Sequence, residues 1–227
     1  MAVIIDTTSF EYIHYCKLHF PGGRGQYNGA YFYSKEIVQN IIPNVKTDRP
    51  WDTLGMRFLG SNDHSIVFIH HNLNHDKVYD WLKKYHDLVL VCSTPATYEW
   101  AKNVPAAYAV KLPLSIDVEY VSRFKAKKTK DVCYSGNRWA FKRQYEKKLP
   151  YYVDYPQQNL SREELLKWVA PYRRCYAIGR CAIEARCLGC EILPFYDPLP
   201  DPDYWQVLDN RDAAKILQEA LDQIDGN

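Results

Sequence analysis

With 227 residues, of which 47% are hydrophobic, the chain is long enough for one large domain or two small ones and apolar enough to bury a core. No apolar run approaches the roughly 20 residues of a membrane span, which excludes a bilayer-spanning protein, and the start "MAVIIDTTSF" lacks the regions of a secretory signal. We therefore expect a cytoplasmic protein whose 7 cysteines are reduced thiols.

The net charge of +2 is distributed unevenly along the chain. Between Arg123 and Lys148 there are ten Lys or Arg residues against Asp131 and Glu146, a local charge of +8 that leaves the rest of the chain at −6. A basic segment in an otherwise balanced protein favours contact with phosphate or nucleic acid. The alternative is a solvated, lysine-rich linker.

The first half of the chain alternates short apolar runs with amphipathic stretches. The runs have no polar alternation, which is typical of strands covered on both faces of a parallel sheet. The predicted strands are Ala2–Ile5, Ser65–His70, Leu88–Ser93 and Ala107–Leu112. The predicted helices are Gly29–Ile41, which should stop before Pro43, and two shorter ones at Asp76–Tyr85 and Ala96–Asn103.

The second half repeats this rhythm. Its predicted strands are Asp131–Gly136, Tyr151–Tyr155, Arg174–Gly179 and Cys190–Phe195, and its predicted helices begin at Ser161, Gly179 and Asp212. Ser161 and Glu164 have the spacing of a capping box, which satisfies free backbone N–H groups at a helix start. The lysine-rich stretch before Asp131 suggests a domain boundary between Ser115 and Lys130.

Strands that alternate with helices predict an α/β fold with parallel sheets. We expect two Rossmann-like halves that face a cleft, residues 1–115 and residues 116–227. In such a fold ligands bind beyond the carboxyl ends of the strands. The second half should therefore present functional residues where its strands end. The segment after the predicted strand "RCYAIG" is one such position.

That segment, "GRCAIEARCLGC", holds one glutamate among three cysteines. Ala182, Ala185 and Gly189 share one helix face, where small residues let a helix lie close to a sheet. Glu184 falls near the positive end of the helix dipole, where a carboxylate is favoured. It either contacts a ligand or forms a surface ion pair with Arg180, four residues earlier, worth at most about 0.5 kcal/mol.

The cysteines allow three interpretations: a zinc site, a nucleophile or small buried packing residues. Cys187 and Cys190 have a CxxC spacing, but Cys181 and Cys187 are about 240° apart around a helix and diverge. A cysteine nucleophile needs a positioned base, and nothing in the sequence marks one. We favour packing and expect neither a bound metal nor a cofactor.

The residues from Gly179 onward carry a family resemblance. "GRCAIEARCLGCEILPF" resembles the donor-binding segment of GT-B glycosyltransferases, above all the large retaining family that includes sucrose and glycogen synthases. Glu184, Ala185 and Gly189 match its E-A-x-x-x-G pattern, in which the glutamate binds the ribose hydroxyls of a nucleotide sugar. We expect Arg180, at the start of the same helix, to belong to the nucleotide-sugar site as well. A carboxylate suits this role because it accepts hydrogen bonds from two adjacent hydroxyls.

The resemblance extends along the chain. "VCYSGNRWAFKR" resembles the start of the second domain in that family, which implies that Arg138 and Lys142, after Gly136, hold the donor diphosphate. "FPGGRGQYNGAYF" resembles the glycine-rich loop before the first helix, in which Gly22 and Gly23 would let backbone N–H groups approach phosphate.

"IVFIHHN" resembles the strand end that places a histidine near the sugar, with His70 as the match and His71 next to it. Taken without the resemblance, the "HHNLNH" cluster could also be a metal site or a solvated loop. "LPLSIDVEYV" resembles the segment between the two domains, which ends here at Asp117.

The chain departs from the family in two respects. Tyr176 stands where the family has a first glutamate near the donor sugar, and the chain is short, so both sheets must be trimmed. Short chains of this kind resemble phage-encoded enzymes, many of which modify DNA bases, and the segment Arg123–Lys148 would suit a DNA acceptor.

The resemblance implies a glycosyltransferase that moves a sugar from a nucleotide-sugar donor, expected to be linked to UDP, to an acceptor. The missing first glutamate keeps a second interpretation open. In that interpretation the chain is a non-catalytic nucleotide- or nucleic-acid-binding protein on the same scaffold.

Overall fold

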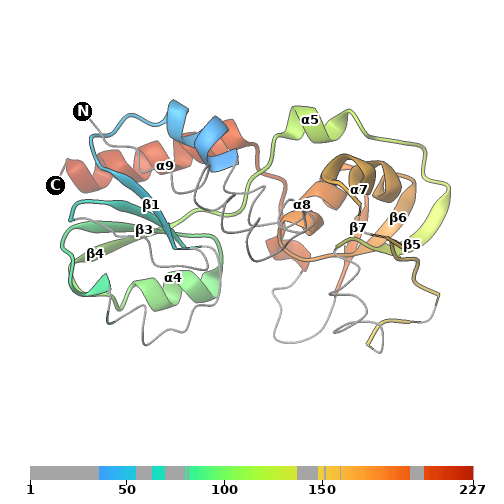
Figure 1. Cartoon of the computed structure of the whole chain (residues 1–227), viewed down its shortest axis with the longest axis horizontal. Coiled ribbons are helices and arrows are strands. Elements are labelled where there is room, and N and C mark those ends of the chain that lie inside the picture. Colours follow the sequence, from blue (N-terminus) through green and yellow to red (C-terminus); the bar gives the residue numbers. More distant parts are fainter. Residues whose placement is uncertain are drawn as a thin grey trace. The chain divides into compact units, whose positions relative to one another are not determined.

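The structure, a computed structural model, describes residues 36–54, 63–69, 80, 82–136, 148–150, 152–158, 160–194 and 202–226. The chain divides into two compact units, and each has its own parallel sheet (Figure 1). The first unit takes in Ile37–Pro113 and Arg211–Asn227, and the second takes in Glu36 and Leu114–Asn210. Parallel sheets combined with helices confirm the predicted α/β class.

Four parallel strands form the sheet of the first unit, in the order β1-β2-β3-β4. They are β1 (Trp51–Leu54), β2 (Ile66–Ile69), β3 (Leu88–Cys92) and β4 (Ala107–Lys111). Every side chain of β2 and β3 is buried, as the unbroken apolar runs predict. Figure 1 shows α4 (Pro95–Ala101) on one side of these strands and α9 (Asn210–Asp225) on the other.

Two features of the first unit differ from the sequence prediction. β1 was not predicted, because "WDTL" has neither a continuous apolar run nor a period of two. The helix expected to stop before Pro43 instead passes from a π-helical stretch, η3 (Ile37–Ile41), into a 3-10 turn, η4 (Ile42–Asn44). Pro43 is tolerated there because it stands near the start of the turn, where a backbone N–H needs no partner.

Three parallel strands form the second sheet, in the order β5-β6-β7. They are β5 (Lys130–Tyr134), β6 (Tyr172–Tyr176) and β7 (Glu191–Leu193). The helices of this unit are α5 (Val118–Ser122), α7 (Arg162–Val169) and α8 (Arg180–Cys187), with a 3-10 turn, η6 (Pro202–Tyr204). α8 packs against β6 and β7 and also against α5 and α7, so it lies at the centre of the unit's core.

The start of α7 has the predicted capping box. Ser161 Oγ accepts a hydrogen bond from the Glu164 N–H (3.3 Å), and Glu164 Oε2 accepts one from the Ser161 N–H (2.7 Å). The strand predicted over Tyr151–Tyr155 is wrong, because its described residues form an isolated bridge, Asp154 with Cys133. Prolines on either side of this stretch cannot donate to a ladder, which limits the pairing.

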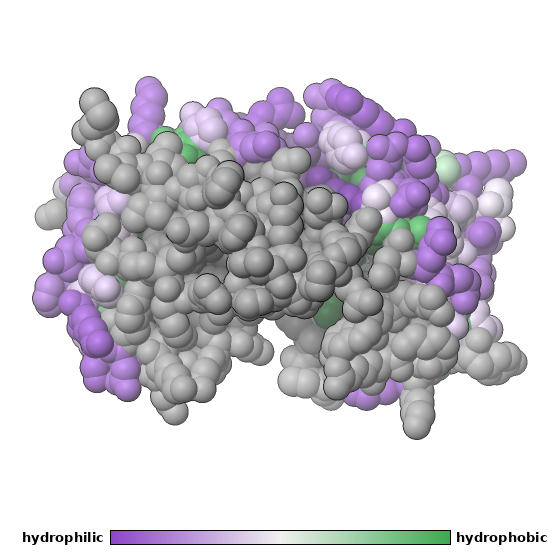
Figure 2. Space-filling view, viewed as in Figure 1, coloured by the Kyte–Doolittle hydropathy of each residue, from purple (hydrophilic) through white to green (hydrophobic). Residues whose placement is uncertain are grey.

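The described helices do not include one with the length and apolar character of a membrane span. α9 has 16 residues and is amphipathic. On the face drawn in Figure 2 the described side chains are mostly hydrophilic, with small apolar spots between them.

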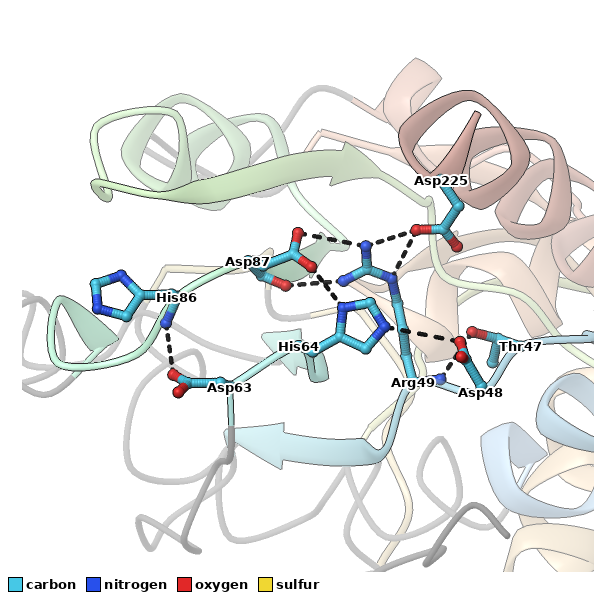
Figure 3. Close-up of polar contacts among 8 residues, drawn as sticks. All are labelled: Thr47, Asp48, Arg49, Asp63, His64, His86, Asp87 and Asp225. Atoms are coloured by element: carbon cyan, nitrogen blue, oxygen red, sulfur yellow. Dashed lines mark hydrogen bonds and ion pairs between the residues drawn. The ribbon is translucent and has the colours of Figure 1, made fainter. Parts of the chain in front are cut away.

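A buried arginine joins the segments that lead into the strands of the first unit (Figure 3). The Arg49 side chain is 2% exposed. Its Nε and Nη2 donate to Asp225 Oδ1 near the end of α9 (3.0 and 2.6 Å), and its Nη1 donates to the backbone oxygen of Asp87 (2.8 Å). A buried cation without such partners would cost several kcal/mol, so Asp87 and Asp225 determine whether Arg49 can be buried at all.

His64 extends this network. Its Nδ1 lies 2.5 Å from Asp87 Oδ2, and both residues have a positive φ, 64° for His64 and 55° for Asp87. Residues other than glycine rarely adopt this left-handed conformation, so the two turns that precede β2 and β3 are held by the polar contacts between them. The network lies at the amino ends of the strands, opposite the edge where α/β proteins bind ligands, and we interpret it as structural.

The network predicts how stability depends on pH. Partial burial acts to raise the pKa of Asp87, but the hydrogen bond with His64 and the charge of Arg49 outweigh it and hold that pKa below its ordinary value. A depressed folded-state pKa contributes stability that is present at neutral pH and is lost as the pH falls through the acid range. Because the Asp87 carboxylate is 42% exposed and solvent screens its charge, Asp87→Asn should lower the free energy of unfolding by only about 0.2–1 kcal/mol at pH 7. The difference from wild type should shrink between about pH 5 and pH 2, as measured by urea unfolding.

Glu219→Gln is the matched control for this experiment, because Glu219 is exposed on α9 and forms no hydrogen bond or ion pair with the described residues. It should follow the wild-type profile. If Asp87→Asn loses unfolding free energy with acid as steeply as the wild type does, the proposed role of Asp87 is wrong.

Candidate functional site

Helix α8 starts at the carboxyl edge of the second sheet. β6 ends at Tyr176, and Gly179 is the N-cap residue of α8, with φ 57° and ψ −137°. This backbone conformation is open to glycine and strained for other residues. No side chain caps the helix start, and its first turn holds no acidic residue. Backbone N–H groups at such a position favour an anionic or hydroxyl-rich ligand.

The small residues of α8 have two different roles. Ala182 and Ala185 are fully buried, as expected for a helix face that lies close to a sheet. Gly189, predicted on the same face, is instead beyond the helix and ends it at φ 83°. The Gly189 N–H donates to the Arg186 carbonyl (2.9 Å) and the Cys190 N–H donates to the Ala185 carbonyl (2.9 Å), which is a Schellman motif.

Glu184 is buried in the second turn of α8, not on the surface near the helix start. Its side chain is 7% exposed. Arg180 Nε donates to Glu184 Oε1 (2.8 Å), and Arg162 Nε, from the start of α7, donates to the same oxygen (3.0 Å). The expected alternative of an exposed Arg180–Glu184 ion pair is therefore wrong. A buried ion pair also differs in energy, since removing one partner of such a pair typically costs about 3–5 kcal/mol.

A second glutamate completes this group. Glu36 Oε1 forms ion pairs with Arg162 Nη1 (2.9 Å) and with Arg180 Nη2, and the Glu36 side chain is 6% exposed. Two arginines and two glutamates therefore share one buried site, which we call the arginine–glutamate quartet: Glu36, Arg162, Arg180 and Glu184. Its formal charge is zero when all four side chains are ionised, which is the condition under which buried charges are tolerated.

Sequence reasoning found Arg180 and Glu184 but missed Glu36 and Arg162. Glu36 belongs to "SKEIV" and Arg162 to the capping-box segment "SREEL", and neither has a motif that marks a buried ion pair. The two glutamates are 148 positions apart, and the chain offers no local spacing that links them.

Gly136 follows β5 at the same edge of the sheet as α8. Tyr134 pairs with Tyr176 across β5 and β6, and the Ser135 N–H donates to the Tyr176 carbonyl (3.0 Å). A Cβ on Gly136 would lie 2.5 Å from the Tyr134 hydroxyl, so the side chain of Tyr134 leaves room for glycine alone unless it moves. Burial raises the pKa of Tyr176, the residue that replaces the family's first glutamate, so it is a neutral phenol at physiological pH.

Six of the predicted site residues lie outside the described residues: Arg138, Lys142, Gly22, Gly23, His70 and His71. The predicted strand Ala2–Ile5 and half of the predicted helix Asp76–Tyr85 lie outside them too.

The described cysteines are free thiols, and all except the half-buried Cys181 are buried. Burial raises the pKa of Cys181 to about 12 and that of Cys190 to about 11. A thiol in this state is protonated at neutral pH and is a poor nucleophile or metal ligand. Within the described ranges no group of three or more His, Cys, Asp or Glu side chains is arranged to hold a metal ion.

Several basic side chains of the segment Arg123–Lys148 bind partners within the protein. Arg123 pairs with Glu119 (2.7 Å), Lys128 Nζ donates to the Ala170 carbonyl (2.8 Å), and Lys130 Nζ donates to the Tyr172 hydroxyl (3.3 Å). Lys125 and Lys127 are exposed, and their side chains form no hydrogen bond or ion pair with the described residues. In the described part of the segment, these two lysines are the ones available to an external phosphate.

Comparisons with protein-family models, with curated proteins and with solved structures give no match for this chain.

Proposed function

We propose that the chain is a glycosyltransferase that binds a nucleotide-sugar donor, with UDP as the expected nucleotide, through the second unit. Two parallel α/β units fit the two Rossmann-like halves of the GT-B fold that the sequence resembles. Glu184 would accept hydrogen bonds from the ribose. The donor is a substrate, and the proposal requires no cofactor or metal.

The observation that carries this proposal is the unequal use of the two Glu184 oxygens. Oε1 accepts from both arginines, whereas Oε2 accepts no hydrogen bond from the described residues. An ionised carboxylate oxygen has room for about two donors, so Oε2 can accept from the hydroxyls of a ligand. Glu184 also lies one turn into a helix that starts at the carboxyl edge of a parallel sheet. Gly136, which follows β5, lies at the same edge.

The alternative is a non-catalytic nucleotide- or nucleic-acid-binding protein on the same scaffold. Tyr176 favours it, because a neutral phenol cannot replace a carboxylate near the donor sugar. Release of sugar from a nucleotide sugar in the absence of acceptor would separate the two functions, since a binding protein leaves the donor intact.

For the acceptor we propose DNA, as in phage enzymes that modify DNA bases. The support is the exposure of Lys125 and Lys127, which lie at the start of the basic segment. Localisation in a cytoplasm, that of the host in the case of a phage protein, belongs to the same proposal.

Calorimetric titration with UDP tests the nucleotide site. The wild type should bind UDP, and Glu184→Gln should weaken binding by about 1.5–3 kcal/mol, the range for hydrogen bonds to charged groups. The variant should also melt at a lower temperature, because Arg162 and Arg180 lose a buried counter-charge. Binding is therefore compared at a temperature where circular dichroism shows both proteins folded.

Glu163→Gln is the control, since Glu163 lies on the exposed side of α7 and pairs with Lys167. It should bind UDP like the wild type. Equal UDP affinity in the wild type and Glu184→Gln would mean that Glu184 is a scaffold residue and that the donor site lies elsewhere.

Filter binding or anisotropy with single- and double-stranded DNA tests the acceptor. Affinity should fall steeply as salt increases, because phosphate contacts release counterions. The double variant Lys125→Glu/Lys127→Glu should weaken DNA binding and leave UDP affinity unchanged. Lys128 is left intact, because its contacts with Ala170 and Cys190 support the fold.

Lys84→Glu/Lys111→Glu makes the same change of net charge at two exposed positions of the first unit and is the control. If both double variants lose DNA affinity equally, the effect is one of net charge. If the wild type binds no DNA at low salt, the acceptor is another molecule.

A further inference from the structure

Both oxygens of the Glu36 carboxylate are held by neighbouring groups. Oε1 accepts a hydrogen bond from Arg180 Nη2 and forms an ion pair with Arg162 Nη1, while Oε2 accepts from the Asn210 side-chain amide (2.8 Å) and the Asp117 backbone N–H (3.1 Å). These four partners come from segments that are far apart in the sequence. With both oxygens held, this carboxylate cannot rotate or withdraw without losing several charge-assisted hydrogen bonds.

Each arginine of the quartet is divided between the two glutamates. Arg180 donates from Nε to Glu184 and from Nη2 to Glu36, while Arg162 donates from Nε to Glu184 and forms an ion pair through Nη1 with Glu36. This arrangement is unusual, since a guanidinium commonly binds one carboxylate with two parallel N–H groups. In Arg180 the two N–H groups that could bind one carboxylate side by side are those of Nε and Nη2. Nε donates to Glu184, but Nη2 donates to Glu36 instead.

The division has a consequence for Glu184. Without the Glu36 charge, Arg180 Nη2 would lose its partner, and because Arg180 Nε already donates to Glu184 Oε1, the guanidinium would form the common two-bond pair by donating from Nη2 to Glu184 Oε2. Glu184 would then have no oxygen for a ligand. The buried site would also hold two cations and one anion, which strengthens the tendency of both arginines to close on the remaining carboxylate.

We propose that Glu36 is a positioning residue of the nucleotide site: it holds the Nη groups of Arg162 and Arg180 and thereby keeps Glu184 Oε2 open for the vicinal hydroxyls of a ribose. Glu36 itself does not contact the ligand. This inference rests on the proposed function, because it assumes that Glu184 Oε2 is the ligand's acceptor.

The test compares UDP affinity in three proteins: wild type, Glu36→Gln and the double variant Glu36→Gln/Arg180→Gln. Glu36→Gln should bind UDP at least about tenfold more weakly, which corresponds to the loss of one hydrogen bond to a charged group. The double variant lacks the guanidinium that would close on Glu184 Oε2, and it leaves Arg162 paired with Glu184. It should therefore regain most of the lost affinity.

Rescue of affinity separates positioning from general destabilisation. If Glu36 were only a structural residue, the double variant would bind UDP no better than Glu36→Gln at a temperature where both are folded. That result, or wild-type affinity in Glu36→Gln, overturns the inference and leaves the proposed function standing. A wild type that binds neither UDP, ADP nor GDP removes both.

Glu36→Asp covers the case in which Glu36→Gln does not fold. It keeps the buried charge, but its side chain is one methylene shorter and cannot reach both arginines while bound to the Asp117 N–H. UDP affinity should then fall by at least about threefold, an intermediate loss because the charge remains. Wild-type affinity in Glu36→Asp would overturn the inference.

Discussion

The second unit depends on a balance of buried charge. Each ion removed from water costs several kcal/mol even after relaxation, so the arginine–glutamate quartet is stable only while its four charges remain paired. Three of its side chains are less than 10% exposed, and Arg162 is 16% exposed. The start of α7, the first two turns of α8 and the position of Glu36 are therefore coupled, because any one of them that moved would leave a charge without its partner.

The first unit also pairs a buried arginine with carboxylates, but there the network is structural. Arg49 is as deeply buried as Arg180, but Asp225 and Asp87 take its N–H groups, and both carboxylates are about 40% exposed. That network lies at the amino ends of its strands, whereas α8 starts at the carboxyl edge of the second sheet. The edge of the sheet, more than the presence of a buried arginine, distinguishes a candidate binding site from a structural contact in this chain.

Periodicity and capping predicted the elements whose signals are local. The runs of β2 and β3, the capping box of α7 and the amphipathic pattern of α9 each lie within one short stretch, and the structure has these elements close to their expected bounds. The environment of Glu184 was not predictable in this way. Its spacing from Arg180 indicated a pair, but burial and the sharing with Arg162 and Glu36 depend on how distant segments meet, and a helical pattern carries no information on that.

The central claim is that Glu184 has one oxygen held by two arginines and the other open to a ligand. A crystal structure of the chain with UDP tests it most directly. We predict that a ribose hydroxyl lies within hydrogen-bond distance of Glu184 Oε2, about 2.5–3.0 Å, while Arg162 and Arg180 remain on Oε1 and Glu36. UDP bound away from Glu184, or a Glu184 whose two oxygens are both taken by arginine, would contradict the account.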